Sequence, residues 1–223
     1  MDPDAFPPPQ VKICGLTDAA QAAAVAALGA AAVGLVFFPK SPRHLRREQA
    51  LSICRALPES VRRVGVFVDE RLERILEVAA GCGLDAVQLH GHEPPEVVRR
   101  LRREGLLVIK ALFFRRTPGP ADAAAYDPSG FLVECGAGTL PGGNAEAWAW
   151  SEARPLADLH PLILAGGLGP ENVVRAVEQA QPDAVDLSSG VEVAPGVKDL
   201  RKVAALMAAV RQCRMKRRPR TIF

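Results

Sequence analysis

One cysteine of this sequence stands where a thiol could move a proton. Cys14 ends the apolar run 11–14 and is followed at once by a glycine turn, residues 15–18, that leads into an alanine-rich stretch. A thiol at the end of a strand and the start of a helix faces the mouth of a sheet, where its pKa is lowered. We therefore predict that Cys14 is a general base, with a buried structural thiol as the alternative.

Two short loops have the composition of a phosphate-binding site. They contribute Gly166 and Gly167 after the apolar run 162–164, and Ser188, Ser189 and Gly190 after the run 184–187. Glycine lets backbone N–H groups approach an anion closely, and serine adds a hydroxyl donor. A thiol at one strand end and a phosphate grip at another indicate an enzyme that acts on a small phosphorylated substrate.

Further polar residues end or follow apolar runs. Glu134 ends a wholly apolar run, and a carboxyl group in such a setting is a candidate general acid or, equally, a salt-bridged rim residue. Arg43 suits bidentate binding of a planar carboxylate, although a solvated arginine is the alternative. His90 and Gln88 are candidates to orient a ligand or to pack in the core. Asp186 is expected to point inward, near the phosphate loop.

These residues need a scaffold that brings strand ends together. Short apolar runs recur at 11–14, 33–37, 63–68, 86–89, 107–111, 131–134, 162–164 and 184–187. Their ends lie roughly 20 to 30 residues apart, about the length of one βα unit. The runs are nearly continuous, as in parallel strands that are buried on both faces. They predict a single-domain (β/α)8 TIM barrel over residues 11–212; an open doubly wound sheet is the alternative.

Helical patterns fall between the runs, at 18–28, 46–57, 70–80, 94–103, 170–180 and 198–211, with shorter candidates at 121–126 and from about Trp148. Each of the longer patterns spaces its apolar residues three and four apart, as an amphipathic helix does. The chain therefore alternates strands and helices throughout. Because active sites of such barrels lie at the carboxyl ends of the strands, the residues that end each run are the candidates for chemistry.

Composition argues against several other classes of protein. The net charge is +3, which is too small to indicate a polyanionic partner. The five cysteines show no CxxC or Cys/His spacing, so we expect neither a disulfide framework nor a metal site. The proline-rich start lacks the features of a signal peptide, and no apolar run of about 20 residues is free of charges and turn signals. We expect a cytoplasmic protein that binds neither membrane nor nucleic acid.

The two ends of the chain are expected to lie outside the barrel. Residues 1–10 predict a flexible, proline-rich N-terminus, and residues 213–223 predict a basic, solvated C-terminal tail. A tail with this charge could bind a polyanion, which is the alternative to a solvated end.

Taken together, these segments resemble the phosphoribosylanthranilate isomerase family of tryptophan biosynthesis. The resemblance covers residues 11–206 and is carried by VKICGLTD (11–18), VGLVFFPKSPRHL (33–45), VGVFVDE (64–70), VQLHG (87–91), VIKA (108–111), LAGGLGPENV (164–173) and VDLSSGVEVAPGVKD (185–199). It implies an Amadori rearrangement of N-(5-phosphoribosyl)anthranilate to 1-(2-carboxyphenylamino)-1-deoxyribulose 5-phosphate. It implies no metal or organic cofactor, and a monomer or a homodimer.

The resemblance also implies roles for the candidate residues. Glu134 would be the acid that protonates the ribose ring oxygen, and Cys14 would be the base that removes the proton from the sugar C2. Arg43 would hold the anthranilate carboxylate, and Asp186 would stabilise the cationic intermediate. The two glycine-containing loops would hold the phosphate.

Two departures from the family pattern lie close to this chemistry. The family normally has aspartate where this chain has Glu134, and one extra methylene moves a carboxyl group by about one ångström. The next loop, usually GG[TS]GK before an aromatic-Asp-Trp stretch, reads GGNAEAWAW at 142–150, with Glu146 at a lysine position. The alternative functions are therefore a catalytically weakened or silent barrel that binds a phosphorylated ligand, and an isomerase or epimerase of another sugar phosphate.

Overall fold

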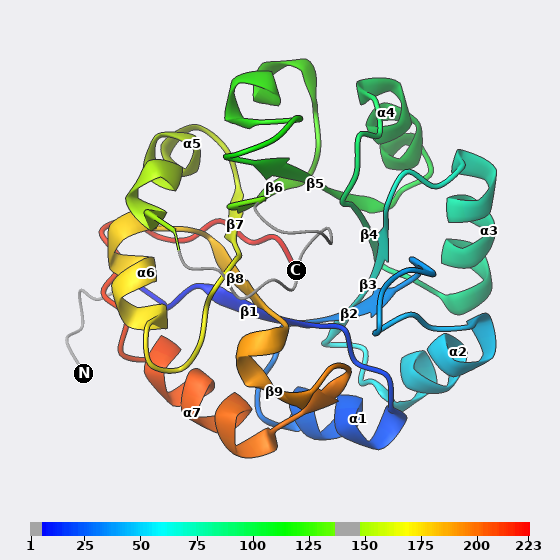
Figure 1. Cartoon of the computed structure of the whole chain (residues 1–223), viewed down its shortest axis with the longest axis horizontal. Helices are drawn as coiled ribbons and strands as arrows, with labels where there is room; N and C mark the ends of the chain where they lie inside the picture. Colours follow the sequence, from blue (N-terminus) through cyan, green and yellow to red (C-terminus); the bar gives the residue numbers. More distant parts are fainter. Residues whose placement is uncertain (1–5, 137–147) are drawn as a thin grey trace.

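Eight parallel strands form a closed barrel, in which each strand pairs with the next along the chain (Figure 1). The computed structural model describes residues 6–136 and 148–223. The strands are β1 (Gln10–Cys14), β2 (Ala32–Val36), β3 (Arg62–Phe67), β4 (Ala86–Leu89), β5 (Leu107–Phe113), β6 (Gly130–Glu134), β7 (Leu162–Leu164) and β8 (Ala184–Leu187). Pairing of β1 with β8 closes the ring. This confirms the predicted (β/α)8 barrel and contradicts the open sheet.

Helices surround the barrel on its outside (Figure 1). They are α1 (Ala19–Ala27), α2 (Arg47–Ala56), α3 (Leu72–Cys82), α4 (Pro95–Arg103), α5 (Arg154–Leu159), α6 (Val173–Ala180) and α7 (Leu200–Val210). Their buried faces pack on the outer faces of the strands, which explains why the strands read as continuous apolar runs. Among the described residues, no helix has the length and apolarity that a membrane span requires.

The crossover between β5 and β6 differs from the others, because it contains a single 3-10 segment, η1 (Pro120–Ala125). The sequence predicted a helix at 121–126, and the observed segment occupies almost the same residues. Proline at both ends of this stretch, Pro120 and Pro128, leaves room for only a turn or two of helix. A second 3-10 segment, η2 (Trp150–Ala153), leads directly into α5, near the start predicted at Trp148.

A layer of small and branched side chains fills the amino-terminal part of the barrel interior. Seven strands contribute to the buried cluster there, with Ala32, Val64, Ala86, Ile109, Leu132, Ile163 and Ala184. Three of the seven are alanines, so the layer leaves space near the axis that another side chain can occupy. Ile222, from the C-terminal tail, packs in this cluster and is 5% exposed.

The C-terminal tail therefore lies across the amino end of the barrel instead of forming the solvated end that its charge predicted. Figure 1 shows the C-terminus over the centre of the ring. The Gln10 side chain accepts hydrogen bonds from the backbone N–H groups of Ile222 and Phe223, and donates one to the Phe223 carbonyl. Arg217 pairs with the fully buried Asp183 at 2.6 Å. The basic tail is ordered because a buried carboxylate of the barrel requires its charge.

At the other end of the chain, the described residues begin at Phe6, so the predicted flexibility of residues 1–5 lies outside them. Pro9 is already buried, and β1 begins at Gln10, one residue before the predicted start of the barrel.

Removing the Ile222 side chain tests whether the tail stabilises the barrel. Ile222→Ala should lower the free energy of unfolding by about 2 to 5 kcal/mol, since it leaves a cavity in the interior layer. Chemical denaturation followed by circular dichroism measures this difference. Arg218→Ala, at an exposed tail position, is the matched control and should stay within about 0.5 kcal/mol of the natural chain. Equal stability of the two variants would contradict the role given to Ile222.

Candidate active site

Six of the predicted site residues lie buried at or just beyond the carboxyl ends of five strands, while those of the two predicted phosphate loops are partly exposed. The six are Cys14 on β1, Arg43 after β2, Gln88 on β4 and His90 directly after it, Glu134 on β6 and Asp186 on β8. Because all barrel strands are parallel, these ends share one mouth. Their contacts divide these residues into two groups, one around β1, β2 and β8 and the other around β4 and β6.

The first group contains a residue that the sequence analysis missed, Lys12. It is fully buried in β1, its Nζ lies 2.9 Å from Asp186 Oδ1, and the two residues are partners across the β1–β8 pairing. Burial alone would lower the pKa of Lys12, but Asp186 and Cys14 outweigh it and raise that pKa. Lys12 could have been predicted from its spacing. Residues two apart on a strand point to the same face, and Lys12 lies two residues before Cys14.

Cys14 lies within this charged surrounding, but its ionisation differs from the prediction. Burial raises the pKa of the thiol; Asp186 adds to this effect, while Lys12 and Lys198 oppose it. The predicted lowering is therefore wrong, because loss of solvent outweighs the nearby positive charges. A general base must be a thiolate, and this is the minor form of Cys14 at neutral pH. The neighbouring cations determine how large that minor fraction is.

In the second group, three side chains lie in a row of close polar contacts: Gln88, His90 and Glu134. Gln88 Nε2 lies 3.0 Å from His90 Nδ1, and His90 Nε2 lies 3.4 Å from Glu134 Oε1. An amide nitrogen can only donate, so Nδ1 accepts and the ring proton of a neutral histidine is on Nε2, facing the carboxyl group. The edge-on contact of His90 with Phe113 fixes the ring plane. Glu134 is 6% exposed, which places it below the solvated rim.

The two predicted phosphate loops lie against each other. Gly166 and Gly167 both adopt positive φ angles, 84° and 66°, which favour glycine. A Cβ on Gly190 would collide with the carbonyl oxygen of Leu168, so the loop after β8 touches the loop after β7. Ser188 and Ser189 stand at the start of η3 (Ser189–Val191). Because the two loops lie this close together, a phosphate bound between them would be held by their backbone N–H groups.

The segment that departs most from the family pattern is described only in part. Residues 137–147, which include Glu146, lie outside the described residues. Beyond them, the indole nitrogens of Trp148 and Trp150 donate to the carbonyl oxygens of Ala165 and Gly166 at 3.1 and 3.3 Å. The two tryptophans therefore connect the end of this segment to the loop after β7.

Arg43 already binds a carboxylate of its own chain. Its Nε lies 2.9 Å from Glu192 Oε1 and its Nη2 lies 2.6 Å from Glu192 Oε2, a bidentate pair. Hydrogen bonding to Glu192 raises the pKa of Arg43. The guanidinium is thus buried and fixed, and it is not the solvated arginine that the sequence left as the alternative.

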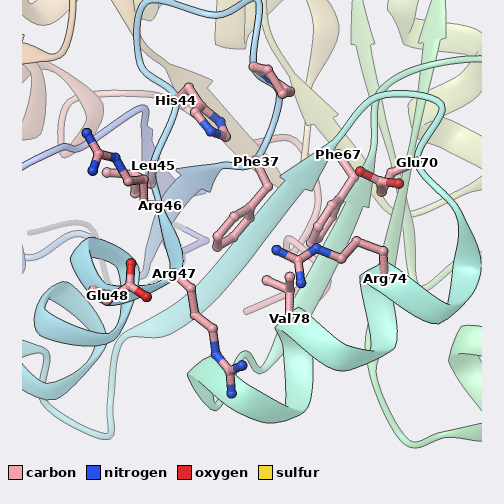
Figure 2. A pocket seen from close by; sticks show the side chains of 11 residues that line it. Phe37, His44, Leu45, Arg46, Arg47, Glu48, Phe67, Glu70, Arg74 and Val78 are labelled. Atoms are coloured by element: carbon pink, nitrogen blue, oxygen red, sulfur yellow. The ribbon is translucent and has the colours of Figure 1, made fainter.

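A separate pocket of about 480 Å³ lies outside the barrel, between the loop after β2 and helix α3 (Figure 2). Its floor is the stacked pair Phe37 and Phe67, whose ring centroids are 5.2 Å apart. None of the predicted site residues lines it. Among the described residues, no group of three or more His, Cys, Asp or Glu side chains is placed to hold a metal ion.

The closed barrel, with acid–base side chains and glycine-containing loops at its strand ends, defines the class as a (β/α)8 barrel with the elements of an acid–base enzyme. Comparison with known proteins narrows this class to one family. A family model described as N-(5'-phosphoribosyl)anthranilate (PRA) isomerase matches residues 11–209. This chain belongs to the N-(5'-phosphoribosyl)anthranilate isomerase family.

Individual relatives resemble nearly the whole chain. An N-(5'-phosphoribosyl)anthranilate isomerase from Desulfatibacillum aliphaticivorans is 50% identical over 214 residues, which cover 96% of this chain and 98% of the relative. A crystal structure of phosphoribosyl anthranilate isomerase in complex with reduced 1-(o-carboxyphenylamino)-1-deoxyribulose 5-phosphate is similar, with a TM-score of 0.79, 40% identity and coverage of 91% and 98%. Monomers generated from the dimeric Thermotoga maritima enzyme have a TM-score of 0.80 at the same identity and coverage.

The Lys12–Asp186 pair can be tested by removing one charge and then both. Lys12→Met should lower the free energy of unfolding by about 3 to 5 kcal/mol, because it leaves a buried carboxylate without its partner. The double variant Lys12→Met with Asp186→Asn should recover most of this loss, since no buried charge is then uncompensated. Chemical denaturation near neutral pH measures both. A double variant less stable than Lys12→Met alone would contradict this account.

Proposed function

We propose that the strand-end site converts N-(5-phosphoribosyl)anthranilate to 1-(2-carboxyphenylamino)-1-deoxyribulose 5-phosphate, with Cys14 as base and Glu134 as acid. The chain is an aldose–ketose isomerase of tryptophan biosynthesis by its family. The observation that carries the residue assignment is the buried pairing of acid–base groups: Cys14 lies beside Lys12, both on β1, and Glu134 at the end of β6 lies beside His90, which follows β4. A relative of known structure binds a reduced form of the product, which supports the substrate.

The reaction begins with proton transfer to the ribose ring oxygen. The Glu134 carboxylic acid gives its proton to that oxygen while the bond between the oxygen and C1 breaks, and the nitrogen lone pair forms a C1=N⁺ Schiff base. The carboxylate that remains can accept a hydrogen bond from His90 Nε2, which lies 3.4 Å away. Gln88 supports this step because it fixes the histidine tautomer.

The second step is removal of the proton from C2. The Cys14 thiolate takes the proton, and the C2–H electron pair forms the enamine as the charge on nitrogen is neutralised. Tautomerisation of this enol–enamine gives the ketone. Asp186 stabilises the cationic Schiff base that precedes this step, and Lys12 orients the Asp186 carboxylate through their contact at 2.9 Å. Arg43 binds the anthranilate carboxylate, and the loops with Gly166, Gly167, Ser188, Ser189 and Gly190 bind the phosphate.

The longer carboxylic acid, glutamate in place of the usual aspartate, has space in this structure. The Glu134 side chain is accommodated as a buried group, 6% exposed, at the end of β6. The absence of a side chain at Gly166 avoids crowding of Glu134 Cβ, an atom that aspartate shares. The comparisons do not support a silent barrel, and we propose an active enzyme in which Glu134 replaces aspartate. We further propose a cytoplasmic enzyme that works as a monomer or a homodimer; one relative is described as dimeric.

Removal of the thiol tests the base. Cys14→Ala should reduce kcat by about 10² to 10⁴-fold, the usual contribution of a general base, with little change in KM. Loss of fluorescence of freshly generated phosphoribosylanthranilate measures turnover. Cys213→Ala, which removes a thiol near the end of α7, is the control and should retain activity. An unchanged kcat in Cys14→Ala would contradict the assignment of Cys14 as the base.

Two substitutions of Glu134 test the acid and the alternative of a silent barrel together. Glu134→Gln keeps the shape but carries no transferable proton, so kcat should fall by about 10² to 10⁴-fold. Glu134→Asp shortens the side chain and should retain measurable turnover in the same fluorescence assay. A natural chain that turns nothing over, beside an active Glu134→Asp variant, would instead mean that the site binds and no longer catalyses.

A further inference from the structure

Three buried charged side chains lie together at the mouth of the barrel: Arg43, Glu192 and Lys198. Glu192 accepts two hydrogen bonds from Arg43, at 2.9 and 2.6 Å, and one from Lys198 Nζ at 2.6 Å. Its Oε1 also accepts from the backbone N–H of Gly196 at 3.2 Å. Burial of three ionised groups is costly unless each is paired, and this cluster pairs all three.

The cluster is built on a small hairpin that follows β8. Its strands are β9 (Glu192–Ala194) and β10 (Val197–Lys198), which pair antiparallel and lie over α1 in Figure 1. Thr17 Oγ1 donates to the Gly196 carbonyl at 2.8 Å. Gln21 binds both the N–H and the carbonyl of Lys198, at 3.0 and 3.2 Å. The hairpin is therefore fastened to the residues that follow Cys14 in the chain.

The side chain of Arg43 passes directly over the residue after Cys14. A Cβ on Gly15 would collide with Arg43 Cδ and would lie 3.2 Å from Ser188 Oγ. Lys198 Nζ also reaches Ser188, at 3.2 Å from its carbonyl oxygen and 3.4 Å from its hydroxyl. One cluster thus connects the strand end of the proposed base, the proposed carboxylate ligand and the proposed phosphate loop.

The charges of the cluster leave capacity for an anion. Burial alone would raise the pKa of Glu192, but hydrogen bonds from Arg43 and Lys198 outweigh it and lower that pKa, so Glu192 stays ionised. Burial lowers the pKa of Lys198, and its hydrogen bond to Glu192 opposes that effect. With both Arg43 and Lys198 protonated, the cluster carries a net charge of +1. Arg43 has five N–H donors and uses two of them on Glu192, which leaves three for a ligand.

We propose that Glu192 and Lys198 are positioning residues for this isomerase: Glu192 fixes the Arg43 guanidinium for the substrate carboxylate, and Lys198 holds Ser188 and sets a positive charge near Cys14. This inference rests on the proposed function and extends it to two residues of the hairpin. The substrate carboxylate joins Glu192 on Arg43 and does not displace it, because Glu192 is also held by Lys198 and Gly196. Lys198 lowers the pKa of the Cys14 thiol, in opposition to burial.

The first test measures the thiol and needs no turnover. The rate of Cys14 alkylation by iodoacetamide, followed by mass spectrometry of the Cys14 peptide, gives the pH at which the thiolate forms. Lys198→Met should move this midpoint upward by about one pH unit, since it removes a nearby cation, and Lys198→Arg should restore it. Lys202→Met removes the same charge from a side chain that donates to the Glu192 backbone carbonyl, and it should leave the midpoint unchanged. An unmoved midpoint in Lys198→Met, or an equal shift in Lys202→Met, would overturn the role of Lys198.

The second test separates positioning from competition. If Glu192 fixes Arg43 for the substrate, Glu192→Gln should raise KM about tenfold with a smaller effect on kcat, because the guanidinium is no longer preorganised. If Glu192 instead competes with the substrate carboxylate, KM should fall, and the inference is wrong. Calorimetric binding of the reduced product analogue by the same variant gives the matching change in affinity. This affinity can be measured even if the natural chain shows no turnover. Absence of turnover would therefore contradict the proposed function, whereas tighter binding by Glu192→Gln would contradict this inference.

Discussion

The buried ion pair between Lys12 and Asp186 lies at the seam where the first strand meets the last, and the mouth of the barrel depends on it. Neither charge is tolerable inside the barrel without the other, so the pair requires that β1 and β8 lie in the register observed. That register also sets Cys14, two residues beyond Lys12, beside the loop that begins at Ser188. The interaction that closes the fold therefore also brings the proposed base to the proposed phosphate loop.

The same segment of chain carries buried carboxylates at three levels of the barrel, each with its own cation. Asp183 at the amino end pairs with Arg217 of the tail, and Asp186 inside the barrel pairs with Lys12. Glu192 at the mouth pairs with Arg43 and Lys198. Each partner comes from a distant part of the sequence or from the hairpin after β8. Burial of charge thus specifies which distant segments meet, while the apolar layers supply most of the stabilisation.

The strand ends could be predicted from the sequence because apolar runs and their spacing are local signals; Cys14 and Glu134 were found in this way. Lys12 and Glu192 were missed for different reasons. Lys12 lies within a run of residues that is otherwise apolar. Glu192 lies beyond the end of β8, on a hairpin that the hydrophobic periodicity of the sequence does not predict. The direction in which the pKa of Cys14 shifts depends on how completely packing excludes water from the thiol. Residue types alone do not reveal this. The tail was misjudged because Asp183, its partner, lies 34 residues before Arg217.

The two sides of the mouth carry different chemistry, and this asymmetry fits a substrate with an anion at each end. Positive charge gathers around β1, β2 and β8, where Arg43 and the serine loop offer donors for a carboxylate and a phosphate. The opposite side, around β4 and β6, carries the carboxyl group of Glu134 beside His90 and Gln88, and the buried Lys110 there is paired with Glu93 at 2.8 Å. In the proposed reaction, a sugar bound through both of its anionic groups on the cationic side lies beside Cys14, with Glu134 on the opposite side of the mouth. The proposed base and the proposed acid thus belong to different groups of residues, and each has its own polar neighbour: Lys12 beside Cys14 and His90 beside Glu134.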